Sequence, residues 1–134
     1  MPAGDGDLNP DALARAEAAL ARLAENYLSW AEADCASLRA CLAEIEAHPA
    51  DAADGLWRLF RIAHDMKGQA GTFGYPLVTE VAHRLCRTIE AMPQPDGHGL
   101  AHLARHVDAL AEIVSGRLEG DGGERGLALL ARLE

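Results

Sequence analysis

The sequence has few residues that favour β-strands and few aromatic residues. Only 11 of its 134 residues are Val, Ile or Thr, and aromatic residues make up 4%. The chain is instead rich in Ala (27 residues) and Leu (19), which lead the scale of helix propensity. This composition predicts an all-α protein, and the length suits a single domain.

Other absences exclude whole classes of protein. No apolar run approaches the ~20 residues that cross a bilayer, and the acidic N-terminus does not resemble a signal peptide, so we expect no membrane association. A net charge of −9 argues against binding to nucleic acid. Three cysteines without a Cys-x-x-Cys motif are typical of reduced thiols in a cytoplasmic protein, and they predict neither disulfides nor a zinc site.

Apolar residues recur at helical spacing from Asp11 onward. One stripe runs from Leu13 to Tyr27 and a second from Ala24 to Ile45, offset by one residue. The segment is therefore predicted to form either two helices that meet near residues 25–26 or one long helix. Residues 1–9 are predicted to be a flexible tail.

Three further amphipathic segments follow, separated by Pro and Gly. Their apolar stripes begin at Leu56, Leu77 and Leu100, and a short last helix is expected from about Glu124 to Leu133. Such helices favour an antiparallel four-helix bundle with its core in residues 24–118, in a single domain of residues 10–134. An additional N-terminal helix and the short C-terminal helix would pack on this bundle. We expect Cys35 in the core, and Trp30 and Trp57 packed between helices.

His64 lies one position away from the apolar stripe of its segment, so its ring is predicted to point outward. Arg61 and Lys67 lie three residues to either side, and Gly68 and Gly71 follow on the same face. Glycine within a helix costs about 1 kcal/mol relative to alanine, so two of them beside an exposed histidine require a reason. A surface without side chains would let another protein approach the imidazole, which can accept and release a phosphoryl group.

The segment His64-Asp65-Met66-Lys67-Gly68, with Gly71 and Phe73-Gly74 after it, resembles the signature of histidine-containing phosphotransfer (HPt) domains. The wider stretch of residues 27–92 is similar to the phosphoacceptor domain of chemotaxis histidine kinases. The resemblance implies a phosphocarrier without a kinase domain of its own, which carries a phosphoryl group on His64 between receiver-domain aspartates in a two-component phosphorelay.

The resemblance also implies roles for the neighbouring residues and for partners. Lys67 would help to neutralise the phosphoryl group, and Gly68 and Gly71 would give clearance for docking. From their positions in the sequence, Arg61, Gln69 and His83 are further candidates for the docking surface. Arg61 could instead pair with nearby acidic residues, and His83 could be an ordinary polar residue beside the helix pair. The partners would be a response-regulator receiver domain and an upstream histidine kinase or hybrid kinase. The chain would need no cofactor, because the Mg²⁺ of the transfer site would belong to the receiver. A four-helix core within one chain needs no second copy to close, so we expect a monomer.

One residue departs from the chemotaxis-kinase pattern. Those kinases have a glutamate three residues after the position of His83, where it hydrogen-bonds the histidine that is to be phosphorylated and raises its reactivity, whereas this chain has Cys86. A thiol does not supply the same anionic acceptor unless it is ionised. This difference favours exchange of phosphate with receiver aspartates over direct phosphorylation by such a kinase.

Two alternative functions remain open at this stage. The chain could be an adaptor that binds a receiver without accepting phosphate, or the dimerisation and phosphoacceptor region of a sensor kinase. The sequence His64-Asp65-Met66-Lys67 superficially resembles the histidine box of sensor kinases, but the proline that usually follows is absent.

A second group of histidines lies in the segment that follows Pro95. His98, His102 and His106 recur every four residues on one helical stripe, a spacing that can place two imidazoles on a zinc ion. Because no carboxylate or thiol accompanies them, we expect a solvated stripe and no metal site.

Overall fold

The computed structural model describes residues 9–92 and 94–134, and the regular secondary structure of these residues is entirely helical. The five α-helices are α1 (Pro10–Ala47), α2 (Ala52–Ala70), α3 (Pro76–Glu90), α4 (Gly97–Ser115) and α5 (Gly123–Ala131). Two short 3-10 helices, η2 (Pro49–Asp51) and η3 (Gly71–Phe73), flank α2. The predicted all-α class is thus confirmed. Residues 1–8 of the predicted tail lie outside the described residues.

Several helix ends have residues that favour them. Asp96 caps α4, where its carboxylate accepts a hydrogen bond of 2.7 Å from the backbone N–H of Gly99. Pro76 occupies the first turn of α3. Proline lacks a backbone N–H, but in the first turn this group would have no hydrogen-bond partner within the helix. Gly74 adopts φ +88° after η3, a left-handed conformation that glycine enters without strain.

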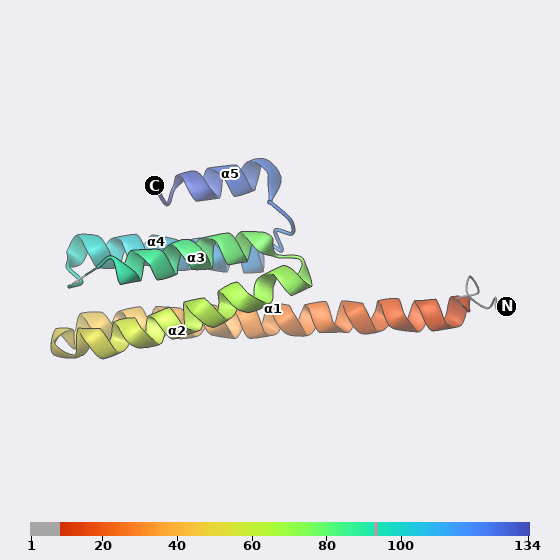
Figure 1. Ribbon diagram of the computed structural model, residues 1–134, viewed down its shortest axis with the longest axis horizontal. Coiled ribbons are helices and arrows are strands. Elements are labelled where there is room, and N and C mark those ends of the chain that lie inside the picture. The colour runs from red at the N-terminus through yellow and green to blue at the C-terminus, as the bar shows by residue number, and fades with distance from the viewer. Residues whose placement is uncertain (1–8, 93) are drawn as a thin grey trace.

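The first helix is continuous over 38 residues, so the alternative of one long helix is correct and the separate N-terminal helix is wrong. Its first buried residue is Tyr27, and the N-terminal part extends past the other helices (Figure 1). Apart from Tyr27 at its end, the first apolar stripe is not buried as predicted, since Leu20, for example, is 66% exposed. The alanine-rich sequence maintains the helix in this part, because alanine has a high intrinsic helix propensity that does not depend on packing against another helix.

Helices α1 to α4 pack in a ring, in which α1 contacts α2, α2 contacts α3, α3 contacts α4 and α4 contacts α1. Their apolar stripes meet in a single core whose largest fully buried side chains include Leu38, Leu59, Leu85, Leu103 and Leu110. Cys35 is buried in this core, as predicted.

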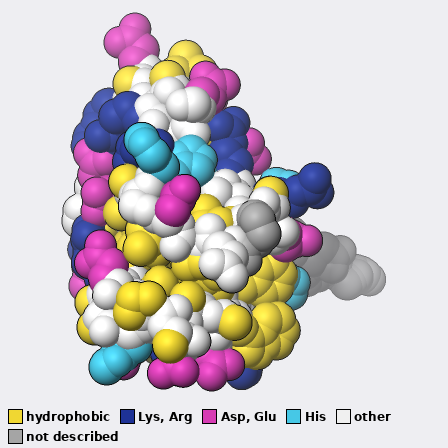
Figure 2. Space-filling model, turned by 90° about the vertical axis from the view of Figure 1, so that its left-hand side faces the viewer, with side chains coloured by type: hydrophobic (Ala, Val, Ile, Leu, Met, Phe, Trp, Pro, Cys, Tyr) yellow, Lys and Arg dark blue, Asp and Glu magenta, His cyan; other side chains and the backbone are white. Residues whose placement is uncertain are grey.

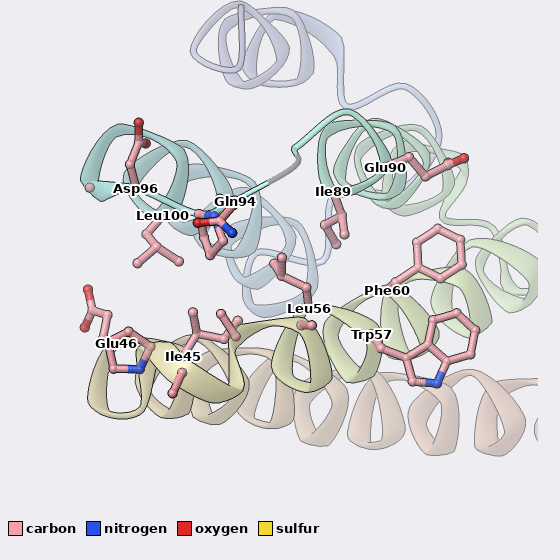
Figure 3. A pocket seen from close by; sticks show the side chains of 16 residues that line it. Ile45, Glu46, Leu56, Trp57, Phe60, Ile89, Glu90, Gln94, Asp96 and Leu100 are labelled. Atoms are coloured by element: carbon pink, nitrogen blue, oxygen red, sulfur yellow. The ribbon is translucent and has the colours of Figure 1, made fainter.

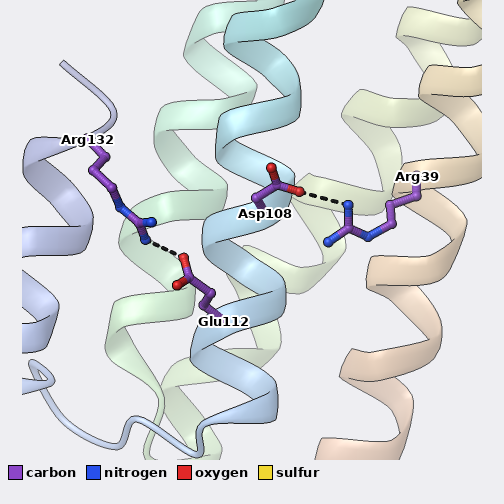
Figure 4. Close-up of polar contacts among 4 residues, drawn as sticks. All are labelled: Arg39, Asp108, Glu112 and Arg132. Atoms are coloured by element: carbon purple, nitrogen blue, oxygen red, sulfur yellow. Dashed lines mark hydrogen bonds and ion pairs between the residues drawn. The ribbon is translucent and has the colours of Figure 1, made fainter.

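Ion pairs join helices at the surface of this core. Arg39 of α1 pairs with Asp108 of α4 at 2.7 Å, and Arg132 beyond the end of α5 pairs with Glu112 of α4 (Figure 4). The predicted C-terminal helix is present as α5, and Leu129 and Leu133 at this end of the chain are buried. None of the described helices combines the length and hydropathy needed to span a membrane.

Two expectations about individual side chains are wrong. Trp30 and Trp57 do not pack between helices, since both are more than half exposed. The histidine stripe of α4 is not uniformly solvated, because it turns from an exposed His98 to a fully buried His106. The stripe drifts around the helix as it proceeds, so its last member faces the neighbouring helices.

Candidate functional site

The amphipathic pattern of α2 positions His64. Leu59, Ala63, Met66 and Ala70 form the buried face of the helix, and His64 lies outside it. Its side chain is exposed, as the sequence predicted. The helix therefore presents the imidazole to solvent near the middle of a rigid element.

Two basic side chains flank the imidazole. Arg61 is exposed and Lys67 is half-buried, and each lies about 60° around the helix from His64. Neither forms an ion pair with another described residue, whereas Arg84 of α3 pairs with Glu80 at 3.0 Å. Their charges are thus available to an incoming anion, although the chain as a whole carries −9.

Gly68 and Gly71 leave the surface beside His64 open. A Cβ atom added at Gly68 would meet nothing within 4 Å, and one at Gly71 would reach only the Thr79 hydroxyl at 4.0 Å. The packing of this chain therefore does not require glycine at either position. Both residues lie within about 40° of His64 around the helix, so the clearance that they give is on the histidine face.

Two hydrogen bonds show the register of α3 along α2. The Thr79 hydroxyl donates to the carbonyl of Lys67 at 3.2 Å, and the Cys86 thiol donates to the carbonyl of Phe60 at 3.9 Å. These pairs show that the two helices run in opposite directions, with His83 level with His64. His83 is exposed too, so two imidazoles border the same part of the surface. Gln69 is also exposed, but it lies about 140° around α2 from His64.

Cys86 lies inside the helix pair rather than at the surface. It is 2% exposed, and burial raises the pKa of its thiol against the opposing effect of Lys67. The thiol therefore remains protonated near neutral pH, and its hydrogen bond goes to a backbone carbonyl. It does not supply the anionic acceptor that a glutamate would give.

An aromatic stack adjoins the histidine and was missed from the sequence. The rings of Trp57 and Phe60 stack with centroids 5.9 Å apart, and Phe60 stacks with His64 at the same distance. The spacing of three and four residues along one helix was the available signal. A prediction that packs Trp57 between helices does not allow for this stack at the surface.

The remaining polar groups show no metal site. No group of three or more His, Cys, Asp or Glu side chains in residues 9–92 and 94–134 is arranged to hold a metal ion. His106 donates from Nδ1 to the carbonyl of His102 at 2.8 Å, and burial lowers the pKa of its imidazole. On α1, burial and then the Asp65 carboxylate raise the pKa of Asp34.

Comparison with known proteins agrees with this geometry. The family model for the Hpt domain matches residues 9–116, which is most of the chain. No curated protein and no solved structure matches the chain. Taken with an exposed histidine on a helix of a four-helix core, the match shows that the chain belongs to the Hpt domain family, whose function is histidine phosphotransfer in two-component phosphorelays.

Proposed function

We propose that His64 is the residue that carries the phosphoryl group, and that it exchanges this group with the aspartate of a receiver domain. The observation that carries the proposal is the exposure of His64 between two unpaired basic side chains, on a face cleared by Gly68. His83 shares the exposure, but only one unpaired basic residue, Arg87, lies one helical turn from it, because Arg84 is paired with Glu80. The local charge therefore favours His64.

The transfer itself requires little from this chain. The lone pair of a ring nitrogen of His64 forms the new P–N bond while the P–O bond to the receiver aspartate breaks, and the aspartate leaves as a carboxylate. Phosphoryl transfer depends mainly on positioning and on neutralisation of charge. Lys67 and Arg61 supply positive charge on this side, and the receiver supplies its aspartate and the Mg²⁺.

The position of Lys67 fits this role. Its backbone carbonyl accepts from Thr79, so α3 holds that turn of α2 in place while the side chain is half-buried. Gly68, Gly71, Gln69 and His83 are proposed to form the docking surface around it. Because Gln69 lies farthest around the helix, it would contact only the edge of a docked receiver.

The proposal includes the arrangement of the chain and its setting. Residues 10–134 form one domain, an antiparallel four-helix bundle to which α5 is joined by Arg132 and Glu112. Its partners are a receiver domain and an upstream kinase or hybrid kinase, and it acts as a monomer. Three free and buried cysteines support a cytoplasmic location.

Phosphotransfer profiling tests the proposal. The chain is incubated with a panel of receivers that carry radiolabelled aspartyl phosphate, beside the variants His64→Gln and His83→Gln. We expect acid-labile label on the wild type and on His83→Gln, and none on His64→Gln. Label that persists in His64→Gln contradicts the assignment, and tight receiver binding without any label would identify an adaptor instead.

A further inference from the structure

A large apolar pocket opens at the end of the bundle where α1 ends and α4 begins. We call it the end pocket, and its volume is about 730 Å³. Ile45, Leu56 and Ile89 form its buried floor, and the half-buried Leu100 of α4 lies beside them (Figure 3). Figure 2 shows hydrophobic side chains gathered at this end of the molecule. The volume is in the range of pockets that bind ligands or anchor side chains.

The charge around the end pocket has one sign. Glu46, Glu90 and Asp96 line it, and no Lys, Arg or His is among its lining residues in the described part of the chain. Asp96 also caps α4, whereas Glu46 and Glu90 form no ion pair with another described residue. The pocket therefore repels anions and attracts a group that is apolar in the middle and positively charged at its edges.

The end pocket is connected to the phosphotransfer site through the aromatic stack. Trp57 and Phe60 line the pocket, and the stack of these two rings continues to His64. Trp57 is 60% exposed, which is unusual for an indole that contacts no other protein. A protein docked over His64 lies within two helical turns of this pocket, because residues 57 and 64 are seven positions apart on α2.

We propose that the end pocket binds a basic amphipathic segment of the phosphotransfer partner, with a bulky apolar side chain in the pocket and Lys or Arg beside Glu46 and Glu90. The inference rests on the proposed function, since it adds a second contact to the docking at His64. The partner is then held at both ends of the aromatic stack, and the end pocket contributes to the choice among partners that share a receiver fold. A small anionic metabolite does not fit, because the carboxylates oppose it.

A peptide probe tests the pocket by itself. The probe is a short synthetic helix with Leu on one face and Lys on the other, and its counterpart carries Glu in place of Lys. With Trp30→Phe in the background, Trp57 alone reports binding by a blue shift of its emission. The variant Glu46→Lys/Glu90→Lys is compared with Glu17→Lys/Glu124→Lys, which makes the same change of net charge at exposed residues away from the pocket.

We expect the Lys peptide to bind, the Glu peptide to fail, and the pocket variant to bind about tenfold more weakly than the control variant. Equal affinity of the two variants, equal binding of both peptides, or no binding at all would overturn the proposal.

Transfer kinetics then test the pocket in its function. For receivers that label His64, the pocket variant should raise the apparent KM about tenfold and leave kcat within about twofold, while labelling by the small donor phosphoramidate stays unchanged. An unchanged KM would contradict a role in docking. If no receiver labels His64, the proposed function fails, and the peptide measurement still decides whether the end pocket binds such a segment.

Discussion

The ring of Phe60 stacks against the ring of His64, with centroids 5.9 Å apart and planes inclined by 24°. The ring of Phe60 also stacks on Trp57, and its backbone carbonyl accepts a hydrogen bond from the Cys86 thiol of α3. The stack limits the rotamers that the imidazole adopts. The imidazole of His64 is therefore exposed to solvent but restricted in orientation. Transfer requires such an orientation, because the attacking nitrogen must approach the phosphorus atom in line with the bond that breaks.

Replacement of Phe60 by leucine should slow phosphotransfer. Phe60→Leu keeps an apolar side chain but removes a stack of a kind that contributes about 0.5–1.5 kcal/mol. If that orientation is lost in the transition state, the transfer rate falls by up to about tenfold. The measurement is the rate of label transfer from a receiver, with urea unfolding as a check of the fold.

Phe73→Leu is the matched control for this change. Phe73 is half-buried like Phe60 and stacks on Tyr27 at 5.0 Å, but it lies beyond the end of α2, in η3, and its ring stacks on a residue of α1 and not on His64. It should lower stability by a similar amount and leave the transfer rate unchanged. Equal effects of both variants on transfer would show that the stack acts through stability alone.

A methyl group at Gly68 should make the protein more stable and less active. Gly68 lies within α2 and has free space for a Cβ, so Gly68→Ala should gain up to about 1 kcal/mol of unfolding free energy from helix propensity. The same methyl group stands on the histidine face and should weaken receiver docking, which is measured as a higher KM for transfer.

Ser115→Ala provides the comparison, because it is an exposed substitution to alanine in α4, which does not border this face. It should leave transfer unchanged. A Gly68→Ala protein with unaltered kinetics would mean that the glycine does not serve docking.

Much of the site was predictable because it depends on one helix. The period of α2 fixes which residues face the core, so the exposure of His64 and the placement of Arg61 and Lys67 beside it follow from sequence spacing. The burial of His106 and the exposure of Trp57 did not follow. Whether one face of a helix contacts a neighbouring helix or water depends on where that neighbouring helix ends. The spacing of apolar residues along the sequence does not determine this.

The projecting part of α1 illustrates the same point. Leu13, Leu20 and Leu23 continue a helical apolar stripe, but α2 and α4 do not extend far enough to cover it. Leu20→Ala should therefore change the unfolding free energy by no more than about 0.5 kcal/mol. Leu38→Ala, at a fully buried position of the same helix, should cost about 2–5 kcal/mol. Urea unfolding compares the two, and a large loss for Leu20→Ala would show that this stripe is covered in solution.

Stability should fall as the pH decreases below about 6.5, the ordinary pKa of histidine. Burial lowers the pKa of His106 in the folded protein, and this effect outweighs the hydrogen bond to the His102 carbonyl, which raises the pKa. The charges of His102, Arg105 and Arg84 lower it further. Between the lowered pKa and 6.5 the unfolded chain binds more protons than the folded chain, so protonation favours unfolding there. Above this range both states hold a neutral imidazole and the effect disappears.

The measurement is urea unfolding of the wild type and of His106→Gln at about pH 7.5 and 5.5. Glutamine does not titrate and can still donate a hydrogen bond to the carbonyl of His102. The variant should lose less stability than the wild type on acidification. An equal loss in both proteins would assign the pH dependence to other groups.

The central claim is that one imidazole, His64, carries the phosphoryl group. The most direct measurement is the identity of the labelled residue, by mass-spectrometric sequencing at neutral pH of the peptide that takes up phosphate from a phosphorylated receiver. We expect a single phosphoryl group on His64. A phosphoryl group on His83 or on any other residue, with His64 unmodified, would contradict it.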